Sequence, residues 1–181
     1  MANWSHLYST HEAGPPQPDS DPLIASGRYF VPAFWIASCS EDDLGIWTDE
    51  DDEEMPYVSL SIPKAISQFD ANRASLEAIS SDVSLYYDQW FDLLNAFEPE
   101  YLRMDLSEVI FMQDENDERF RKAVEFFDDV NQSNLEAFLS FSSFTDILDE
   151  TNRGKLTDYA VVAGQSTELT ASDYLVGMRD V

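Results

Sequence analysis

The chain has few basic residues: 10 Lys and Arg side chains stand against 36 carboxylates, which gives a formal net charge of −26. Proteins that bind nucleic acids or anionic membranes contact phosphates through Lys and Arg. Direct binding to nucleic acid or to a membrane surface is therefore disfavoured. Because such a charge also destabilises the folded state through self-repulsion, we expect it to serve the recognition of a basic protein partner.

Cysteine, histidine and glycine are scarce as well. Cys39 is the only cysteine, which excludes an intramolecular disulfide and a cysteine-based zinc site. The two histidines, His6 and His11, lie outside any metal-binding or catalytic motif. The six glycines are scattered singly, so the sequence contains no phosphate-binding loop. We therefore expect no cofactor, no metal and no enzymatic activity.

Long apolar runs are missing too, and the first residues carry neither a basic nor an apolar signal region. What is present is a typical globular composition, with 44% hydrophobic and 13% aromatic residues. A length of 181 residues fits one domain over 1–181. The sequence predicts a soluble cytoplasmic protein without membrane association.

Residue spacing predicts an α+β fold in which about five helices pack on a small, mostly antiparallel sheet. Strands are predicted over 4–9, 57–61, 101–105, 156–163 and 174–178. Helices are predicted after Pro32, over 63–80, over 83–97, from Ser107, over 120–130, and from a capping box at Ser133 to Leu148. A proline-rich connector is expected at 13–22.

An acidic stretch at 41–54 dominates the middle of the chain. Its carboxylates are Glu41, Asp42, Asp43, Asp49, Glu50, Asp51, Asp52, Glu53 and Glu54. No Lys or Arg occurs between Arg28 and Lys64, so these charges have no opposite charge nearby in sequence. Gly45 and the adjacent like charges predict a surface loop.

A second acidic segment precedes the helix predicted around Phe120. It contains Asp114, Glu115, Asp117 and Glu118 and is expected to be a loop. Neither segment fits a calcium-binding loop, which needs a glycine at its sixth position. Glu54 would take that position in a loop opened by Asp49, and Arg119 would take it in one opened by Asp114.

Trp47 lies inside the first acidic stretch, beside Ile46. One interpretation is a local hydrophobic anchor that ties the loop to the body of the protein. The other is an exposed aromatic anchor within a charged rim, a setting that is enriched at interface hot spots. The sequence leaves both interpretations open.

The opening Met1-Ala2-Asn3-Trp4-Ser5-His6-Leu7-Tyr8-Ser9, followed by Val31-Pro32 and Trp35, resembles the start of an uncharacterised family of small acidic bacterial proteins. The resemblance covers the first part of the chain and implies no site residue, because the family has no established activity. In size, acidity and α+β pattern the chain is also similar to immunity proteins that neutralise toxins of interbacterial competition.

The leading hypothesis is therefore an immunity protein that occludes the basic active-site region of a cognate toxin. The predicted partner-binding residues are the carboxylates of both acidic segments together with Trp47. One alternative is a DNA mimic that inhibits a nucleic-acid-binding protein and carries rows of carboxylates at phosphate-like spacing. A third is a hydrolase with paired carboxylates, which predicts a pocket with an acid of raised pKa.

Overall fold

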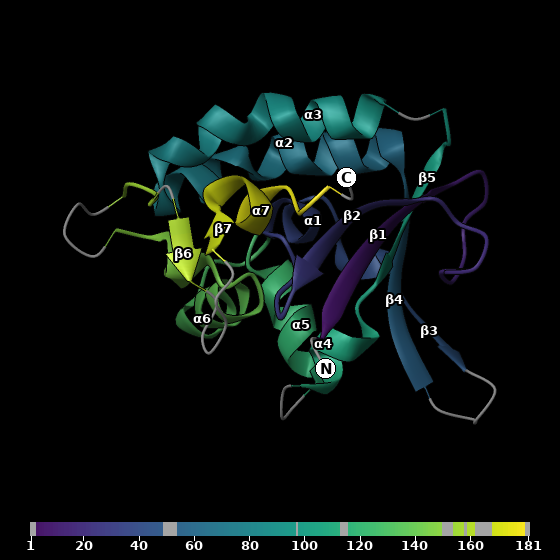
Figure 1. Ribbon diagram of the computed structural model, residues 1–181. Helices are drawn as coiled ribbons and strands as arrows, with labels where there is room; N and C mark the ends of the chain where they lie inside the picture. Colours follow the sequence, from purple (N-terminus) through teal and green to yellow (C-terminus); the bar gives the residue numbers. More distant parts are fainter. Residues whose placement is uncertain are drawn as a thin grey trace.

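A computed structural model describes residues 3–48, 54–96, 98–112, 116–149, 154–157, 159–161 and 168–179. In these ranges a five-stranded antiparallel sheet has the order β2-β1-β5-β4-β3, and the same ranges contain seven α-helices (Figure 1). The predicted α+β class is confirmed. A separate two-stranded ladder pairs β6 (Tyr159–Val161) with β7 (Glu168–Thr170).

One face of the sheet carries the hydrophobic core. The strands are β1 (Trp4–Thr10), β2 (Leu23–Arg28), β3 (Leu44–Thr48), β4 (Glu54–Ser61) and β5 (Tyr101–Asp105). Leu7, Met104 and Val58 lie opposite one another on β1, β5 and β4, and each is fully buried. Because side chains alternate along a strand, this register points every second residue toward the helices. β1 and β5 confirm two predicted strands.

The helices bury a shared aromatic and aliphatic cluster against this face. They are α1 (Ala33–Ala37), α2 (Ile62–Ile79), α3 (Tyr87–Asn95), α4 (Ser107–Phe111), α5 (Asn116–Glu125), α6 (Gln132–Phe141) and α7 (Ala171–Leu175), with 3-10 helices η1 (Glu41–Asp43), η2 (Ser81–Tyr86) and η3 (Phe144–Ile147). Every residue of α1 is buried. Within the described ranges, none of the helices combines the length and apolarity needed to cross a membrane.

Local capping explains where the helices begin and corrects two predictions. Ser61 caps α2 by accepting a hydrogen bond from the Lys64 backbone N–H at 3.3 Å. Asn131, not Ser133, caps α6, since its side chain accepts from the Asn134 N–H at 3.0 Å. The strand predicted over 174–178 is wrong: a capping box at Thr170 opens helix α7 there instead.

The proline-rich connector at 13–22 is tied to the outer face of the sheet. Asp21 accepts a hydrogen bond from the Arg103 guanidinium at 2.8 Å, and both side chains are almost fully buried. The Gly14 N–H donates to the hydroxyl of Ser59 at 3.0 Å. The connector therefore covers part of β4 and β5, although it forms no strand or helix of its own.

Strand β2 forms one border of the sheet and was not predicted. A Cβ at Gly27 would lie 2.5 Å from both the Phe30 carbonyl oxygen and the Ser5 Oγ, so the close packing of this strand requires glycine. The outer side of β2 pairs with the C-terminal segment. Ser26 and Met178 exchange two backbone hydrogen bonds, each of 2.8 Å. This pairing closes the border.

Candidate functional site

The described part of the acidic stretch, 41–48 and Glu54, is not a surface loop. Its described residues form the 3-10 helix η1 and the strands β3 and β4, which pair as an antiparallel hairpin. The physical reason is the alternation of Leu44 and Ile46, which lie opposite Val58 and Pro56 on the core side of the ladder. The predicted partner contacts Asp49, Glu50, Asp51, Asp52 and Glu53 lie outside the described residues.

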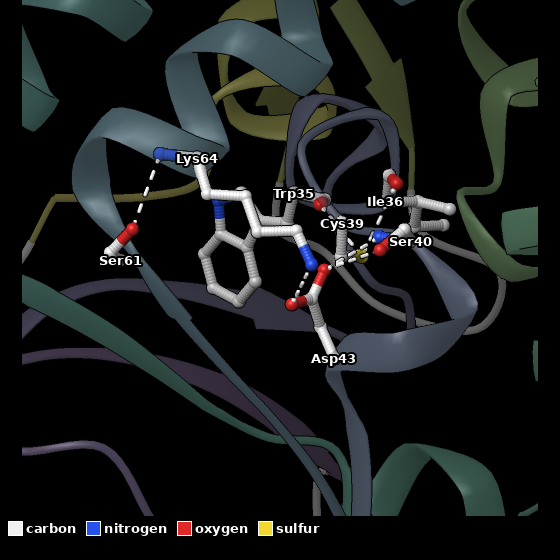
Figure 2. A network of polar contacts seen from close by, with 7 residues as sticks. All are labelled: Trp35, Ile36, Cys39, Ser40, Asp43, Ser61 and Lys64. Atoms are coloured by element: carbon white, nitrogen blue, oxygen red, sulfur yellow. Dashed lines mark hydrogen bonds and ion pairs between the residues drawn. The ribbon is translucent and has the colours of Figure 1, made fainter.

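Asp43 holds the start of this hairpin. Its carboxylate accepts hydrogen bonds from the backbone N–H and hydroxyl of Ser40, both at 2.8 Å, and forms an ion pair with Lys64 at 2.6 Å (Figure 2). The residue is only 8% exposed. Asp43 was predicted to contact a partner, but its burial and three bonds give it a structural role. Asp43 is therefore not part of the exposed candidate surface.

Cys39 lies beside this network, and its thiol is shielded from solvent. Its thiol is buried and donates to the carbonyl groups of Trp35 and Ile36, both at 3.3 Å (Figure 2). Burial, and secondarily the charge of Asp43, raises the pKa of the Cys39 thiol far above its usual range. Among the described residues no group of His, Cys, Asp and Glu side chains is arranged to hold a metal ion.

The two acidic segments meet at one surface. Arg121 of α5 donates to the Glu41 carboxylate at 2.5 Å, which ties the helix to η1. A cavity of about 110 Å³ lies between the hairpin and α5. Its lining residues are Leu44, Gly45, Ile46, Pro56, Ile110, Asp117, Phe120 and Arg121. Segments that are about 70 residues apart in sequence therefore share one cavity.

We call this region the hairpin–helix surface and define it by Glu41, Asp42, Ile46, Trp47, Glu54, Asp117 and Glu118, all of which are exposed. Six of these residues come from the predicted set, and Ile46 is added by the structure. The predicted contacts Asp114 and Glu115 lie outside the described residues.

The centre of the hairpin–helix surface is apolar. Ile46 is 57% exposed and Trp47 is 36% exposed. Because neighbouring residues of a strand point to opposite faces, Ile46 faces the cavity beside α5 and Trp47 faces the other side of the sheet. Trp47 is thus not a core residue. Sequence reasoning missed Ile46, although the alternation of Leu44 and Ile46 was the signal for it.

The charges around this centre are only partly neutralised. Glu118 forms an ion pair with Lys122 at 2.8 Å, and the hydrogen bond and charge of Lys122 lower the pKa of the Glu118 carboxyl. Glu41 is paired with Arg121. For Asp42, Glu54 and Asp117, the described part of the chain supplies no ion pair. These three carboxylates remain available to a cationic partner.

Two other concavities bear on the hydrolase hypothesis. One, of about 280 Å³, is lined by a single carboxylate, Asp146, together with Arg28 and Tyr174 among others. Partial burial raises the pKa of the Asp146 carboxyl. The second contains Asp92 and Asp173, but Asp173 already accepts two hydrogen bonds from Thr170 as the cap of α7. The first concavity therefore offers no second carboxylate, and one of the two carboxylates of the second is already committed to the start of α7.

Comparisons of the chain with protein families, with curated proteins and with solved structures find no match.

Proposed function

We propose that this protein binds a basic partner protein through the hairpin–helix surface and acts in the cytoplasm as an immunity protein, occluding the basic active-site region of a cognate bacterial toxin. The observation that carries the proposal is the meeting of two acidic segments around an exposed apolar centre. Ile46 and Trp47 supply that centre on opposite faces of β3. Glu54 and Asp117 lie on the Ile46 face, and neither they nor the exposed Asp42 form ion pairs in the described part of the chain.

This combination suits rapid and selective recognition of a basic protein. The net charge of −26 attracts cations and repels acidic proteins, which raises the association rate for a basic partner. Once the partner is bound, desolvation of the Ile46 and Trp47 side chains slows dissociation, because apolar anchors surrounded by a polar rim dominate binding energy.

A charge-reversal experiment tests the proposal. The variant Asp42→Lys/Glu54→Lys/Asp117→Lys is compared with Asp88→Lys/Asp92→Lys/Glu98→Lys, which makes the same change in net charge at exposed residues elsewhere. Each protein is used to capture partners from a lysate of its native organism at low and at high salt. We expect the wild type and the control to retain a basic protein that the first variant loses.

Kinetics and toxicity then decide the role of the captured protein. Reversal at the hairpin–helix surface is expected to slow association by at least about tenfold and to flatten its salt dependence, because the steering charge is inverted. The captured protein should inhibit bacterial growth unless the wild-type chain is co-expressed. Equal losses in both triple variants would contradict the proposed surface, and competition with DNA for the captured protein would favour the DNA-mimic alternative.

A further inference from the structure

The second border of the sheet is formed by β3, at the hairpin–helix surface. β3 pairs with β4 on its inner side, and within the described ranges no strand pairs with its outer side. Figure 1 shows β3 at the edge of the molecule, with its outer side directed away from the helices. An edge strand presents a row of backbone N–H and C=O groups, so the outward groups of β3 determine how another strand could pair with it.

A backbone hydrogen bond at the C-terminal end of β4 shows which residues of β4 bond to β5 and which bond to β3. The Ile62 N–H donates to the Glu100 carbonyl in line with the β4–β5 register, at 2.8 Å. In an antiparallel ladder, backbone groups alternate between the two neighbouring strands from one residue to the next. The register is unshifted back to Tyr57, so Val58 bonds to β5 and Tyr57 bonds to β3.

The same alternation of backbone hydrogen bonds continues into β3. Gly45 lies opposite Tyr57, so the backbone groups of Gly45 and of Trp47, two residues later, bond to β4. Pro56 supports this assignment independently. It lies opposite Ile46 and has no N–H, so it cannot donate a hydrogen bond to β3, and the Ile46–Pro56 pair is a pair without hydrogen bonds.

Leu44, Ile46 and Thr48 therefore direct their backbone groups outward. The Leu44 N–H is used by the 3-10 turn, where it donates to the Glu41 carbonyl. The groups left at the edge are the Leu44 C=O, both the N–H and C=O of Ile46, and the Thr48 N–H. β3 contains neither Lys nor Pro, and its register with β4 has no bulge, so none of these three features blocks pairing at this edge.

The surrounding charge selects what can pair with this edge. Ile46, Thr48 and Glu54 share one face of the hairpin, and Asp117 lines the cavity on the same face. A second copy of this chain would bring another acidic edge against these carboxylates and would be repelled. A strand with Lys or Arg side chains on this face and apolar side chains on the Trp47 face would be attracted.

We propose that the β3 edge is extended by a strand of the basic partner, which adds to the sheet and alternates basic with apolar side chains. The inference rests on the proposed function and specifies how the partner is recognised. Backbone hydrogen bonds to Ile46 provide the register, as in other cases of strand addition, while Glu54 and Asp117 select for positive charge. The added strand would follow the outer side of β3 from Leu44 to Thr48.

The probe is the peptide acetyl-Lys-Val-Lys-Val-Lys-Val-Lys-amide, tested by titration against the wild type and two variants. Ile46→Pro removes the outward N–H, and Ile46→Val keeps it with a similar β-branched side chain. We expect Ile46→Pro to weaken binding about tenfold and Ile46→Val by no more than about twofold. Because the lost N–H points away from β4, Ile46→Pro should fold, whereas Trp47→Pro should be destabilised by the loss of a ladder bond.

Amide hydrogen exchange by NMR gives the second readout. In the free protein the Ile46 and Thr48 amides should exchange faster than those of Gly45 and Trp47, and the peptide should slow the exchange of Ile46 and Thr48. Light scattering at the NMR concentration checks that the protein alone stays monomeric. A dimer formed through β3 would overturn the proposal.

Two further outcomes would overturn strand addition. The first is peptide binding that leaves the Ile46 and Thr48 amides unprotected, or that tolerates Ile46→Pro as well as Ile46→Val. Binding to the acidic surface, and with it the proposed function, would then stand without strand pairing. The second is no binding of the peptide to the wild type. The lysate capture described above tests the proposed function separately from either result.

Discussion

The two borders of the central sheet are built in opposite ways. At β2, the residues that pair are uncharged, and the chain closes the border itself through the Ser26–Met178 hydrogen bonds. At β3, carboxylates lie at both ends of the strand, and the described chain leaves the outer side open. A neutral edge invites indiscriminate pairing and is covered, whereas an acidic edge is protected against other copies of the same chain by repulsion.

The contrast suggests a division of roles between the borders. The closed border stabilises the fold, because Trp35 donates from Nε1 to the Val176 carbonyl at 2.8 Å and so holds the C-terminal segment against β2. The open border contributes little burial, since Ile46 and Trp47 remain exposed. Substitutions should therefore affect stability at the first border and binding at the second.

The largest expected effect is on the closed border. Gly177 has φ of +102°, and a Cβ there would lie 2.9 Å from the Trp35 ring and 3.2 Å from the Ala25 Cβ. Gly177→Val should lower the free energy of unfolding by about 4 kcal/mol, through backbone strain and overpacking together. Urea denaturation measures the loss.

Gly154→Val is the matched control, because Gly154 also has positive φ, +88°, but no atom of the described residues lies within 4 Å of its Cβ position. Gly154→Val should lower the free energy of unfolding only through backbone strain, by about 1–2 kcal/mol. Equal losses at both glycines would mean that packing of the C-terminal segment does not stabilise the closed border.

The second prediction separates two neighbouring acids at the open border. Asp43→Ala should lower the free energy of unfolding by about 3 kcal/mol, because Ser40 and Lys64 lose a buried charged acceptor. Asp42→Ala, at an exposed residue, should change stability by less than about 0.5 kcal/mol while weakening partner binding. Denaturation and titration of both variants test this. A similar loss of stability at Asp42 would show that the whole turn, and not Asp43 alone, is structural.

The third prediction concerns pH at the closed border. Tyr174 of α7 is 1% exposed and precedes the segment that pairs with β2. Burial, and secondarily the charges of Asp146 and Asp173, raises the pKa of the Tyr174 phenol to about 12. The unfolded phenol ionises near about pH 10, so stability is fully present below that pH and is lost as pH rises toward the folded pKa.

Relative to Tyr174→Phe, the wild type should therefore lose about 2 kcal/mol of unfolding free energy between about pH 10 and about pH 12. Denaturant unfolding of both proteins across this range measures the difference. Tyr87 ionises in both proteins, so its contribution cancels in the comparison. Parallel curves for wild type and variant would contradict a buried neutral phenol at Tyr174.

Local sequence patterns predicted much of the fold. The alternation in 4–9 and 101–105 and the helical spacing in 63–80 identified β1, β5 and α2, because these signals depend on residues within the element. α7 was missed because the aromatic Tyr174 and the β-branched Val176 favoured a strand over 174–178. The Thr170 and Asp173 capping box, a local signal, would have identified it as a helix.

Other elements depend on contacts that are distant in sequence. β2 contains small residues of low strand propensity and forms where Gly27 packs against Ser5 and Phe30. β3 was missed because the density of charge in 41–54 outweighed the alternation around Ile46, whereas the strand predicted over 57–61 lies within β4. The site itself depends on the bond between Glu41 and Arg121, which no local pattern predicts.

The buried thiol of Cys39 offers a practical advantage. Because it is the only cysteine and is shielded from solvent, a cysteine introduced at Thr48 would be the single reactive thiol of the protein. A fluorophore or spin label attached there would report on the outer side of β3 without background labelling. The same uniqueness would allow single-site crosslinking, so a partner could be trapped and identified at a known position.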